Sequence, residues 1–296
     1  MRVAVIGAAG RMGRWFTQYF LDQHHDVSIF DTNRPALVSV ARGSPVIRRK
    51  SLKSAVETSD FCLLSVPLTE APEVCKTVIQ LARESTVVAE VSSLKQSVLP
   101  VLKRAKRLHL VALSLHPLFG PGARNIAGQR MAIIPVNDAR KEMKIARSVF
   151  PASRLVLTSM KEHDSAMATL LSVIHFSSIA LTLLLRGENL ALLQTLSGTS
   201  FRVALALAES ILEDQEDLLI SIQVDNPYSM PMIRKYLDKA LMMASVIESG
   251  DRSRLKQVIK QAKDVAALDH ESGSSYKRIY QMVETFQGAK GHKVRS

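Results

Sequence analysis

Short apolar runs alternate with amphipathic stretches through the first half of the chain. The apolar runs are RVAVI, VSIF, FCLLSVP, TVVAEV, HLVALSL, MAIIPV and RLVLT. Helical periodicity separates several of them, most clearly at Glu70–Ala82, Leu94–Ala105 and Ala139–Phe150. Such alternation is typical of strands joined by crossover helices, and it predicts an α/β domain with a doubly wound, mainly parallel sheet.

After about residue 159 the strand signals stop and long helical periods follow. The apolar positions predict helices over His163–Leu185, Glu188–Leu196, Phe201–Leu212, Met230–Glu248, Ser253–Ala266 and Ser274–Phe286. We therefore predict an α/β domain over residues 1–158 and an all-helical domain over residues 159–287. Residues 288–296, GAKGHKVRS, are glycine-rich and basic without an apolar period, so we expect a flexible tail there.

The composition narrows the class of protein. Hydrophobic residues make up 47% of the chain, which is ample for a packed core. We see no secretory leader before the first apolar run, and Cys62 and Cys75 are too few for a disulfide framework, so we expect a cytoplasmic protein. The apolar stretch Ala166–Leu185 is about as long as a membrane span, but it carries a histidine, threonines and serines. We expect a helix buried in a core or a dimer, and no membrane.

The net charge of +12 favours an anionic partner. Only 5% of the residues are aromatic, and none interleaves with the basic clusters Arg48–Lys50 and Lys103–Arg107. A surface that stacks single-stranded nucleic acid needs such interleaving, so we expect a small anionic molecule rather than nucleic acid. We expect no bound metal.

A glycine-rich turn, GAAGRMG, follows the first apolar run at residues 7–13. Its glycines lie where a first strand would turn into a first helix, and this geometry brings the backbone close to a pyrophosphate at a helix N-terminus. The turn therefore predicts a Rossmann-like dinucleotide site, although an ordinary strand–helix turn has the same glycines. The residues expected to hold the cofactor here are Gly7, Ala8, Gly10, Arg11, Met12 and Gly13.

Further cofactor contacts are expected on the next strand ends. The second apolar run ends at Asp31, at the distance beyond the glycines expected of a carboxylate that binds the adenosine ribose. An acid at this place repels a 2′-phosphate, which favours NAD over NADP, whereas Arg34 could still accept NADP. Ser65, Val66 and Pro67 end another run and would lie along the same cofactor.

Two later motifs identify a family. Ser92-Ser93-Leu94-Lys95 follows the run TVVAEV, and HPLFGP, residues 116–121, follows HLVALSL. Both are expected at the carboxyl rim of the sheet, and together they resemble the prephenate dehydrogenase family over most of the chain. The turn GAAGRMG also resembles dihydrodipicolinate reductases, but their paired-histidine and lysine signature is absent.

This resemblance implies oxidative decarboxylation of prephenate to 4-hydroxyphenylpyruvate, a precursor of tyrosine, with hydride passing from C4 to NAD⁺. The substrate hydroxyl then needs an acceptor, and the motif points to His116. Ser93 would bind the same hydroxyl or the nicotinamide, and Lys95 would steady the arrangement. A strand-end histidine bonded only to backbone is the plain alternative for His116.

His163, His175 and Arg202 are weaker substrate-binding candidates, because either histidine could also be a core residue. The substrate arginine of the family is not found around Leu218–Met230, which leaves prephenate and arogenate both open. A partner subunit could supply one, since the family pairs its helical domains into homodimers.

The chain begins at its first strand and ends soon after its last helix, so we expect a monofunctional protein. Two other functions remain open. One is a two-domain NAD(P) reductase of an imino or 3-hydroxy acid, and the other is a non-catalytic NAD(P)-sensing or nucleic-acid-binding regulator.

Overall fold

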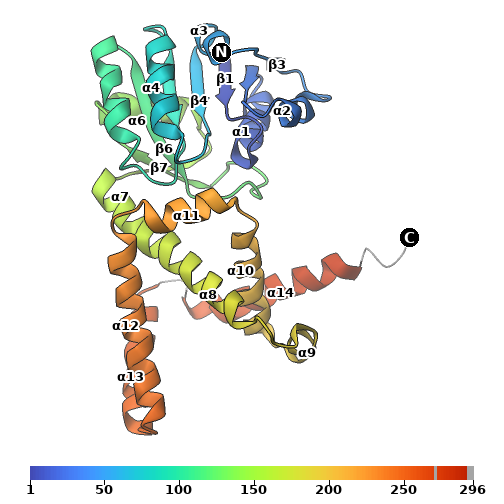
Figure 1. Cartoon of the computed structure of the whole chain (residues 1–296), viewed down its shortest axis with the longest axis vertical. Helices are drawn as coiled ribbons and strands as arrows, with labels where there is room; N and C mark the ends of the chain where they lie inside the picture. Colours follow the sequence, from blue (N-terminus) through green and yellow to red (C-terminus); the bar gives the residue numbers. More distant parts are fainter. Residues whose placement is uncertain (270–271, 292–296) are drawn as a thin grey trace. The chain divides into compact units, whose positions relative to one another are not determined.

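The computed structural model describes residues 1–269 and 272–291 of the chain. The chain forms two compact units, Met1–Met167 and Ala168–Ser296 (Figure 1). The first unit combines strands and helices, and the described residues of the second are helical.

The first unit is built on an eight-stranded sheet with the strand order β3-β2-β1-β4-β5-β6-β7-β8. Neighbouring strands are parallel except for β6 and β7. The strands are β1 (Arg2–Ile6), β2 (Asp26–Phe30), β3 (Ile47–Arg48), β4 (Phe61–Leu64), β5 (Val87–Glu90), β6 (Val111–Pro117), β7 (Arg130–Ile134) and β8 (Arg154–Leu157). The chain order reverses direction between β1 and β4, and ligands of such sheets bind outside the carboxyl ends at that point.

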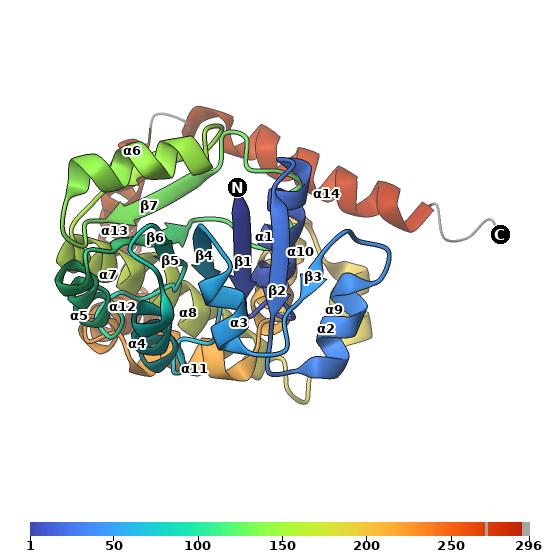
Figure 2. The same cartoon turned by 90° about the horizontal axis from the view of Figure 1, so that it is seen from above.

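Helices cover both faces of this sheet. Alternate residues of β1 show why: Val3 and Val5 join one buried cluster, and Ala4 and Ile6 join the other. The first cluster packs against α1 (Arg11–Asp22), α2 (Arg34–Ala41) and α6 (Ala139–Val149). The second packs against α3 (Leu52–Glu57), α4 (Ala71–Leu81) and α5 (Leu99–Leu102). Figure 2 shows α6 on one side of the strands and α3 and α4 on the other. The predicted α/β class is confirmed.

The segment after β5 differs from its prediction. A helix was expected over Leu94–Ala105, but α5 spans only four residues and continues as the 3-10 helix η1 (Lys103–Leu108). Two features explain why this helix begins later than predicted. The Asp164 carboxylate accepts the backbone N–H groups of Lys95 and Gln96, and Pro100 has no N–H to give to a preceding turn. The motif around Lys95 therefore lies on an ordered loop.

The second unit is helical throughout its described residues, as predicted. Its elements are the π-helix η2 (Ala168–Val173), α8 (Ile174–Leu184), α9 (Leu190–Leu196), α10 (Thr199–Leu212), α11 (Glu216–Val224), α12 (Ser229–Glu248), α13 (Arg252–Ala266), η3 (Ser272–Ser274) and α14 (Ser275–Gly291). α10 packs against α8, and α12 packs against η2. In η2 the carbonyl oxygen of Ser172 accepts a hydrogen bond from the Gln223 side chain, and the Ser172 hydroxyl donates to Ile222. The widened turn is thereby satisfied.

The boundary between the units lies inside one helical run. α7 (Met160–Met167) packs against β7, so the first unit extends to Met167. The division predicted at residues 158–159 remains a prediction. Residues 288–291 of the predicted tail continue α14, and residues 292–296 lie outside the described residues.

The apolar helix expected to be buried is largely uncovered. The run Met160–Leu184 is long and apolar enough to cross a membrane by length and composition alone, which is weak evidence for a span. Only 28% of its most apolar window is buried, and Leu183 and Leu184 are 64% and 71% exposed. The expectation of burial in a core is therefore wrong within this chain.

A buried carboxylate organises the turn between β7 and α6. Glu142, which is 3% exposed, accepts N–H groups from Val136, Asn137 and Asp138 at 2.8, 2.7 and 2.8 Å. Replacing it by Gln should lower the free energy of unfolding by about 1–3 kcal/mol, because an amide nitrogen cannot accept these bonds. Urea denaturation measures the change. Glu84→Gln, at an exposed site, is the matched control, and equal stability of the two variants would contradict the prediction.

Candidate active site at the carboxyl ends of the strands

The glycine turn after β1 tolerates no side chain at two of its positions. Gly7 has φ +81°, and a Cβ atom there would lie 2.2 Å from the carbonyl oxygen of Ser65. A Cβ atom on Gly13 would lie 2.0 Å from the carbonyl oxygen of Gly7. The turn therefore packs tightly against both the strand end at Ser65 and the first turn of α1.

Helix α1 presents its N-terminus to this turn. Its N-cap is Gly10, which provides no side-chain cap for the first N–H groups of the helix. Ala8 is buried, Met12 packs against the first core cluster, and the Arg11 side chain is exposed. Open N–H groups and the positive end of a helix dipole suit a pyrophosphate, so the residues present fit a dinucleotide.

Asp31 ties the turn to the second strand. It follows β2, and its two carboxylate oxygens accept the N–H groups of Ala9 and Asn33, each at 2.8 Å. Each oxygen retains acceptor capacity toward a ribose. Arg34 is engaged elsewhere, because its guanidinium donates to the carbonyl oxygens of Arg49 and Lys50 at 2.9 and 2.7 Å.

Ser65, Val66 and Pro67 follow β4, the strand next to β1 on the other side. The Ser65 N–H donates to the carbonyl oxygen of Ile6 at 2.8 Å, and both Ser65 and Val66 are near neighbours of Gly7. The structure thus brings together the predicted cofactor residues that follow β1, β2 and β4.

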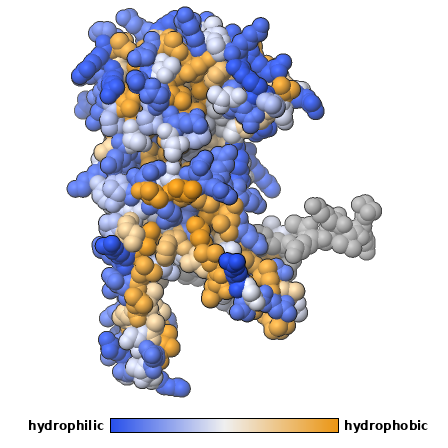
Figure 3. All heavy atoms as spheres, in the orientation of Figure 1, coloured by the Kyte–Doolittle hydropathy of each residue, from blue (hydrophilic) through white to orange (hydrophobic). Residues whose placement is uncertain are grey.

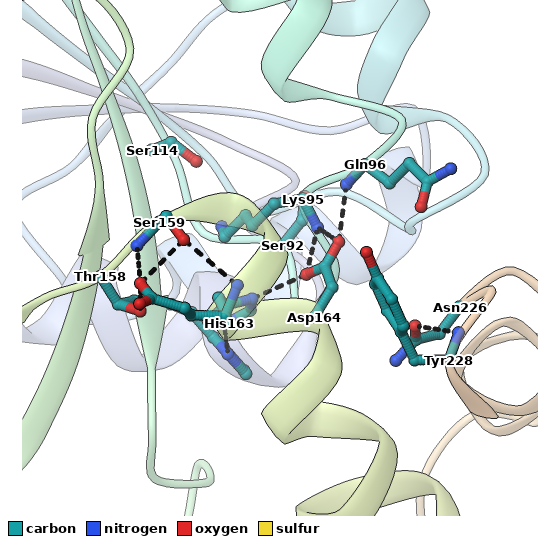
Figure 4. Close-up of polar contacts among 12 residues, drawn as sticks. Ser92, Lys95, Gln96, Ser114, Thr158, Ser159, His163, Asp164, Asn226 and Tyr228 are labelled. Atoms are coloured by element: carbon teal, nitrogen blue, oxygen red, sulfur yellow. Dashed lines mark hydrogen bonds and ion pairs between the residues drawn. The ribbon is translucent and has the colours of Figure 1, made fainter. Parts of the chain in front are cut away.

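The catalytic candidate His116 belongs to a buried chain of hydrogen bonds. It is 6% exposed near the end of β6, and its Nδ1 lies 2.9 Å from Nε2 of His163. The Nδ1 of His163 lies 2.7 Å from a carboxylate oxygen of Asp164. Asp164 also accepts the backbone N–H groups of Lys95 and Gln96, as Figure 4 shows. His163, predicted as a weak substrate contact, is therefore a direct partner of His116.

This chain of contacts has a polarity. With both rings neutral, Asp164 accepts the proton on Nδ1 of His163, which leaves Nε2 of His163 as an acceptor. His116 then donates through Nδ1, so its Nε2 keeps a lone pair. Burial above all, and then the positive charge of nearby Lys95, hold the pKa of His116 well below its usual range. His116 is thus a neutral imidazole, and no other described residue bonds to its Nε2.

Lys95 lies beneath this arrangement with no exposed surface. Its Nζ donates to Glu90 Oε1 at 2.8 Å and to the carbonyl oxygen of Leu115 at 2.6 Å. Burial lowers the pKa of Lys95, and the Glu90 charge opposes that shift. Glu90 was not predicted from the sequence, although an acid that ends an otherwise apolar strand close to a lysine was a signal for it. Asp164 was not predicted as the acid that orients His163 either.

The hydroxyl of Ser93 is uncommitted. The side chain is half-buried, and it makes no hydrogen bond with any other described residue. Its neighbours are fixed, because Ser92 N–H donates to Glu90 at 2.7 Å and Lys95 N–H donates to Asp164. Ser93 can therefore offer its hydroxyl to a ligand without losing a bond.

Comparison with known proteins identifies the family. The model "Prephenate dehydrogenase, nucleotide-binding domain" matches residues 21–135, and "Prephenate dehydrogenase, dimerization domain" matches residues 159–261, together well over half of the chain. The chain belongs to the prephenate dehydrogenase family. Its first unit carries the nucleotide-binding domain of that family.

Named relatives and solved structures of this family are similar to the chain over most of its length. A "Probable arogenate/prephenate dehydrogenase" of Methanocaldococcus jannaschii is 18% identical over 93% of this chain. The chain spans 63% of that relative's length and 66% of the Haemophilus influenzae T-protein, to which it is 23% identical over 89% of its own length. Two crystal structures share the fold at 17% identity. The Aquifex aeolicus prephenate dehydrogenase has a TM-score of 0.71 and covers 89% of this chain and 96% of its own, and the Synechocystis arogenate dehydrogenase has 0.68, 89% and 98%.

The remaining substrate-binding candidates, His175 and Arg202, lie in the second unit. His175 is 8% exposed on α8, and its Nδ1 finds no partner among the described residues. Arg202 on α10 is exposed, and its Nε donates to Ser197 at 3.1 Å. It lines a cavity of about 280 Å³ with Thr199 and Tyr280. Among the residues that the structure describes, no cluster of three metal-ligating side chains occurs.

The glycine turn yields a test that separates cofactor binding from folding. A Cβ atom on Gly10 would meet the Gly7 carbonyl oxygen at 3.3 Å, a contact that a small shift relieves, but it would stand where the pyrophosphate approaches. Gly10→Ala should leave the melting temperature nearly unchanged and weaken NADH binding about tenfold or more, a loss that corresponds to about 1.4 kcal/mol.

Gly13→Ala should lower both stability and NADH affinity, since its Cβ atom collides with backbone. Gly122→Ala, at an open position, is the control. Calorimetry and NADH fluorescence titration provide the measurements. Normal NADH affinity in Gly10→Ala would remove the turn from the cofactor site.

Proposed function

We propose that this protein catalyses the NAD⁺-dependent oxidative decarboxylation of prephenate to 4-hydroxyphenylpyruvate, a step of tyrosine biosynthesis. The observation that carries the proposal is the buried, neutral His116 with its free Nε2, on the same carboxyl rim as the glycine turn. The name of the M. jannaschii relative supports this substrate class, as does the A. aeolicus enzyme, described in complex with hydroxyphenyl propionate and NAD+.

The chemistry calls for an acceptor at the substrate hydroxyl. When bound, NAD⁺ would supply the acceptor for the hydride that leaves C4 of the ring. Positive charge builds on C4 while the C1–carboxylate bond breaks, and its electron pair completes the aromatic ring as CO₂ leaves. Nε2 of His116 accepts the hydrogen bond of the C4 hydroxyl and relieves this charge, and the proton stays on the phenol when the ring is aromatic. Asp164 stabilises His116 through His163.

Ser93 and Lys95 have different roles in this proposal. The free hydroxyl of Ser93 binds the C4 hydroxyl or the nicotinamide amide, because it is accessible and uncommitted. Lys95 has no exposed surface, so it positions the loop and the strand rather than touching substrate.

NAD is the proposed cofactor. Asp31 stands at the end of β2, where its charge opposes a 2′-phosphate, and Arg34 is committed to two backbone carbonyls. These contacts disfavour NADP.

The dianionic substrate also needs cations, and His175 and Arg202 are proposed as its further contacts. Arogenate remains the alternative substrate. It differs from prephenate only in an amino group on the side chain, and the family includes both activities. The family assignment disfavours the imino or 3-hydroxy acid reductase and the non-catalytic regulator.

A homodimer formed through the helical unit is the proposed assembly. The family model for residues 159–261 is a dimerization domain, and the second unit exposes many large apolar side chains, as the orange surface in Figure 3 shows. Burying such side chains is the main driving force of association. Both cysteines are free and buried, and a cytoplasmic location remains a prediction.

Turnover tests the proposed function. Purified protein with NAD⁺ should form NADH and release CO₂ when prephenate is added, and a faster rate with arogenate would select the alternative. His116→Asn should reduce kcat about 10²–10⁴-fold while NADH still binds, because the acceptor at Nε2 is lost. His24→Asn is the matched control, since His24 is exposed at φ +57°, which Asn tolerates. No NADH from either substrate would refute the function.

Light scattering tests the assembly. Leu241 on α12 is 68% exposed, and Leu241→Glu should convert a dimer into a monomer at micromolar concentration, since a buried charge opposes association. Val38→Glu places the same charge at an exposed apolar site of the first unit and should leave the dimer intact. A dimer that survives Leu241→Glu would move the interface away from this face of α12.

A further inference from the structure

Glu90 forms a second buried polar cluster behind the histidine chain. It ends β5 and has no exposed surface, and β5 pairs with β6 so that Glu90 lies opposite Ser114. Its Oε1 accepts from Lys95 Nζ at 2.8 Å and from the Ser114 hydroxyl at 2.5 Å, and its Oε2 accepts from Ser92 N–H at 2.7 Å. One carboxylate therefore joins the end of β5 to the loop at Ser92 and Lys95 and to Ser114 on β6, the strand that carries His116.

The cluster reaches His116 by two routes. Ser114 lies two residues before His116 on β6, and Lys95 donates to the carbonyl oxygen of Leu115, the residue immediately before it. From the other side, the N–H of Lys95 is held by Asp164, which leads through His163 to His116. The contacts close a ring that passes through both the backbone and the imidazole of His116.

An ion pair with no exposed surface is costly, because both charges have left water. An apolar pair of similar volume would hold two strands at least as well, so stability alone does not account for a charged pair at this place. The geometry suits positioning: the pair ends on the hydroxyl of Ser114 and the carbonyl of Leu115, the two residues that precede His116 on β6.

We propose that Glu90 is a positioning residue for His116: with Ser114 it anchors Lys95 against the Leu115 carbonyl, and so fixes the strand end that carries the imidazole. The inference rests on the role proposed above for His116. Glu90 itself does not touch substrate, because its carboxylate is enclosed.

The charged and titratable groups around His116 come from three elements of the first unit. Lys95 and Glu90 come from β5 and its loop, and His163 and Asp164 come from α7. Cys75 on α4 is close enough to Lys95 to interact with it, and burial raises the pKa of that thiol, so it stays neutral. The positive charge of Lys95 opposes protonation of His116, and Glu90 keeps that charge in place.

Two substitutions separate the effect of the Glu90 charge from that of its side-chain length. In Glu90→Asp the charge remains but the side chain is shorter, so kcat should fall roughly 10- to 100-fold while the pKa of His116 stays low. In Glu90→Gln the buried Lys95 loses its counter-ion and gives up its proton, so kcat should fall similarly and the pKa of His116 should rise. The KM for NAD⁺ should change less than about twofold in both, since the glycine turn is untouched.

The whole chain is used in the assembly state in which it is purified. Three quantities are measured: kcat and KM, the pH dependence of kcat/KM, and the NMR titration of ¹⁵N-labelled His116. The His116 signal is assigned by its loss in His116→Asn. The acid limb of the profile should lie below the ordinary histidine range in the wild type and move upward in Glu90→Gln. Glu142→Gln is the control, because it too removes a buried carboxylate from the first unit. It should lower stability without changing kcat, the acid limb or the His116 titration.

If Glu90→Gln lowers the melting temperature as Glu142→Gln does but keeps wild-type kcat and the wild-type His116 titration, Glu90 is only structural and the inference is overturned. If Glu90→Gln fails to fold, Ser114→Ala decides. It should lower kcat about 3- to 10-fold at unchanged KM for NAD⁺, and wild-type kcat would overturn the inference. A wild type without turnover refutes the proposed reaction, and the His116 titration still decides the role of Glu90.

Discussion

The carboxylate of Asp164 is the constraint on which the site depends. It lies at the start of a helix, yet it accepts two backbone N–H groups from the loop after β5 and the Nδ1 proton of His163. The two amides set where the loop can run. The imidazole contact sets which nitrogen of each histidine carries hydrogen, and so which nitrogen of His116 keeps a lone pair. Position and proton arrangement therefore follow from one buried group.

The buried polar groups of this network bond mainly to one another. Glu90 and Lys95 neutralise each other, and Ser114 and Leu115 provide the remaining donor and acceptor. Only Ser93 and one nitrogen of His116 are left without partners by this network, among the described residues around it. Satisfied groups are held in place, whereas these two remain able to bond a ligand.

Contiguous motifs were the predictable part of this molecule. The glycine turn, Asp31 and His116 each follow an apolar run, and strand ends share one edge of a parallel sheet, so their sequence positions imply their neighbourhood. Glu90 was missed because its meaning depends on strand register, which places it opposite Ser114. The exposure of the long apolar helix was also not predicted. An apolar sequence indicates that a surface is buried, but not whether the same chain or a partner buries it.

The contact between Gly13 and the carbonyl of Gly7 bears on how such turns evolve. The chain itself forbids a side chain at both positions, whether or not a dinucleotide is present. A descendant that lost its cofactor would still need these two glycines to keep the strand and the helix together. Gly10 is held less strictly, because a Cβ atom there would lie 3.3 Å from the Gly7 carbonyl oxygen rather than colliding with backbone. Of the three glycines, Gly10 is therefore the one that a bound dinucleotide would require, whereas the fold itself requires Gly7 and Gly13.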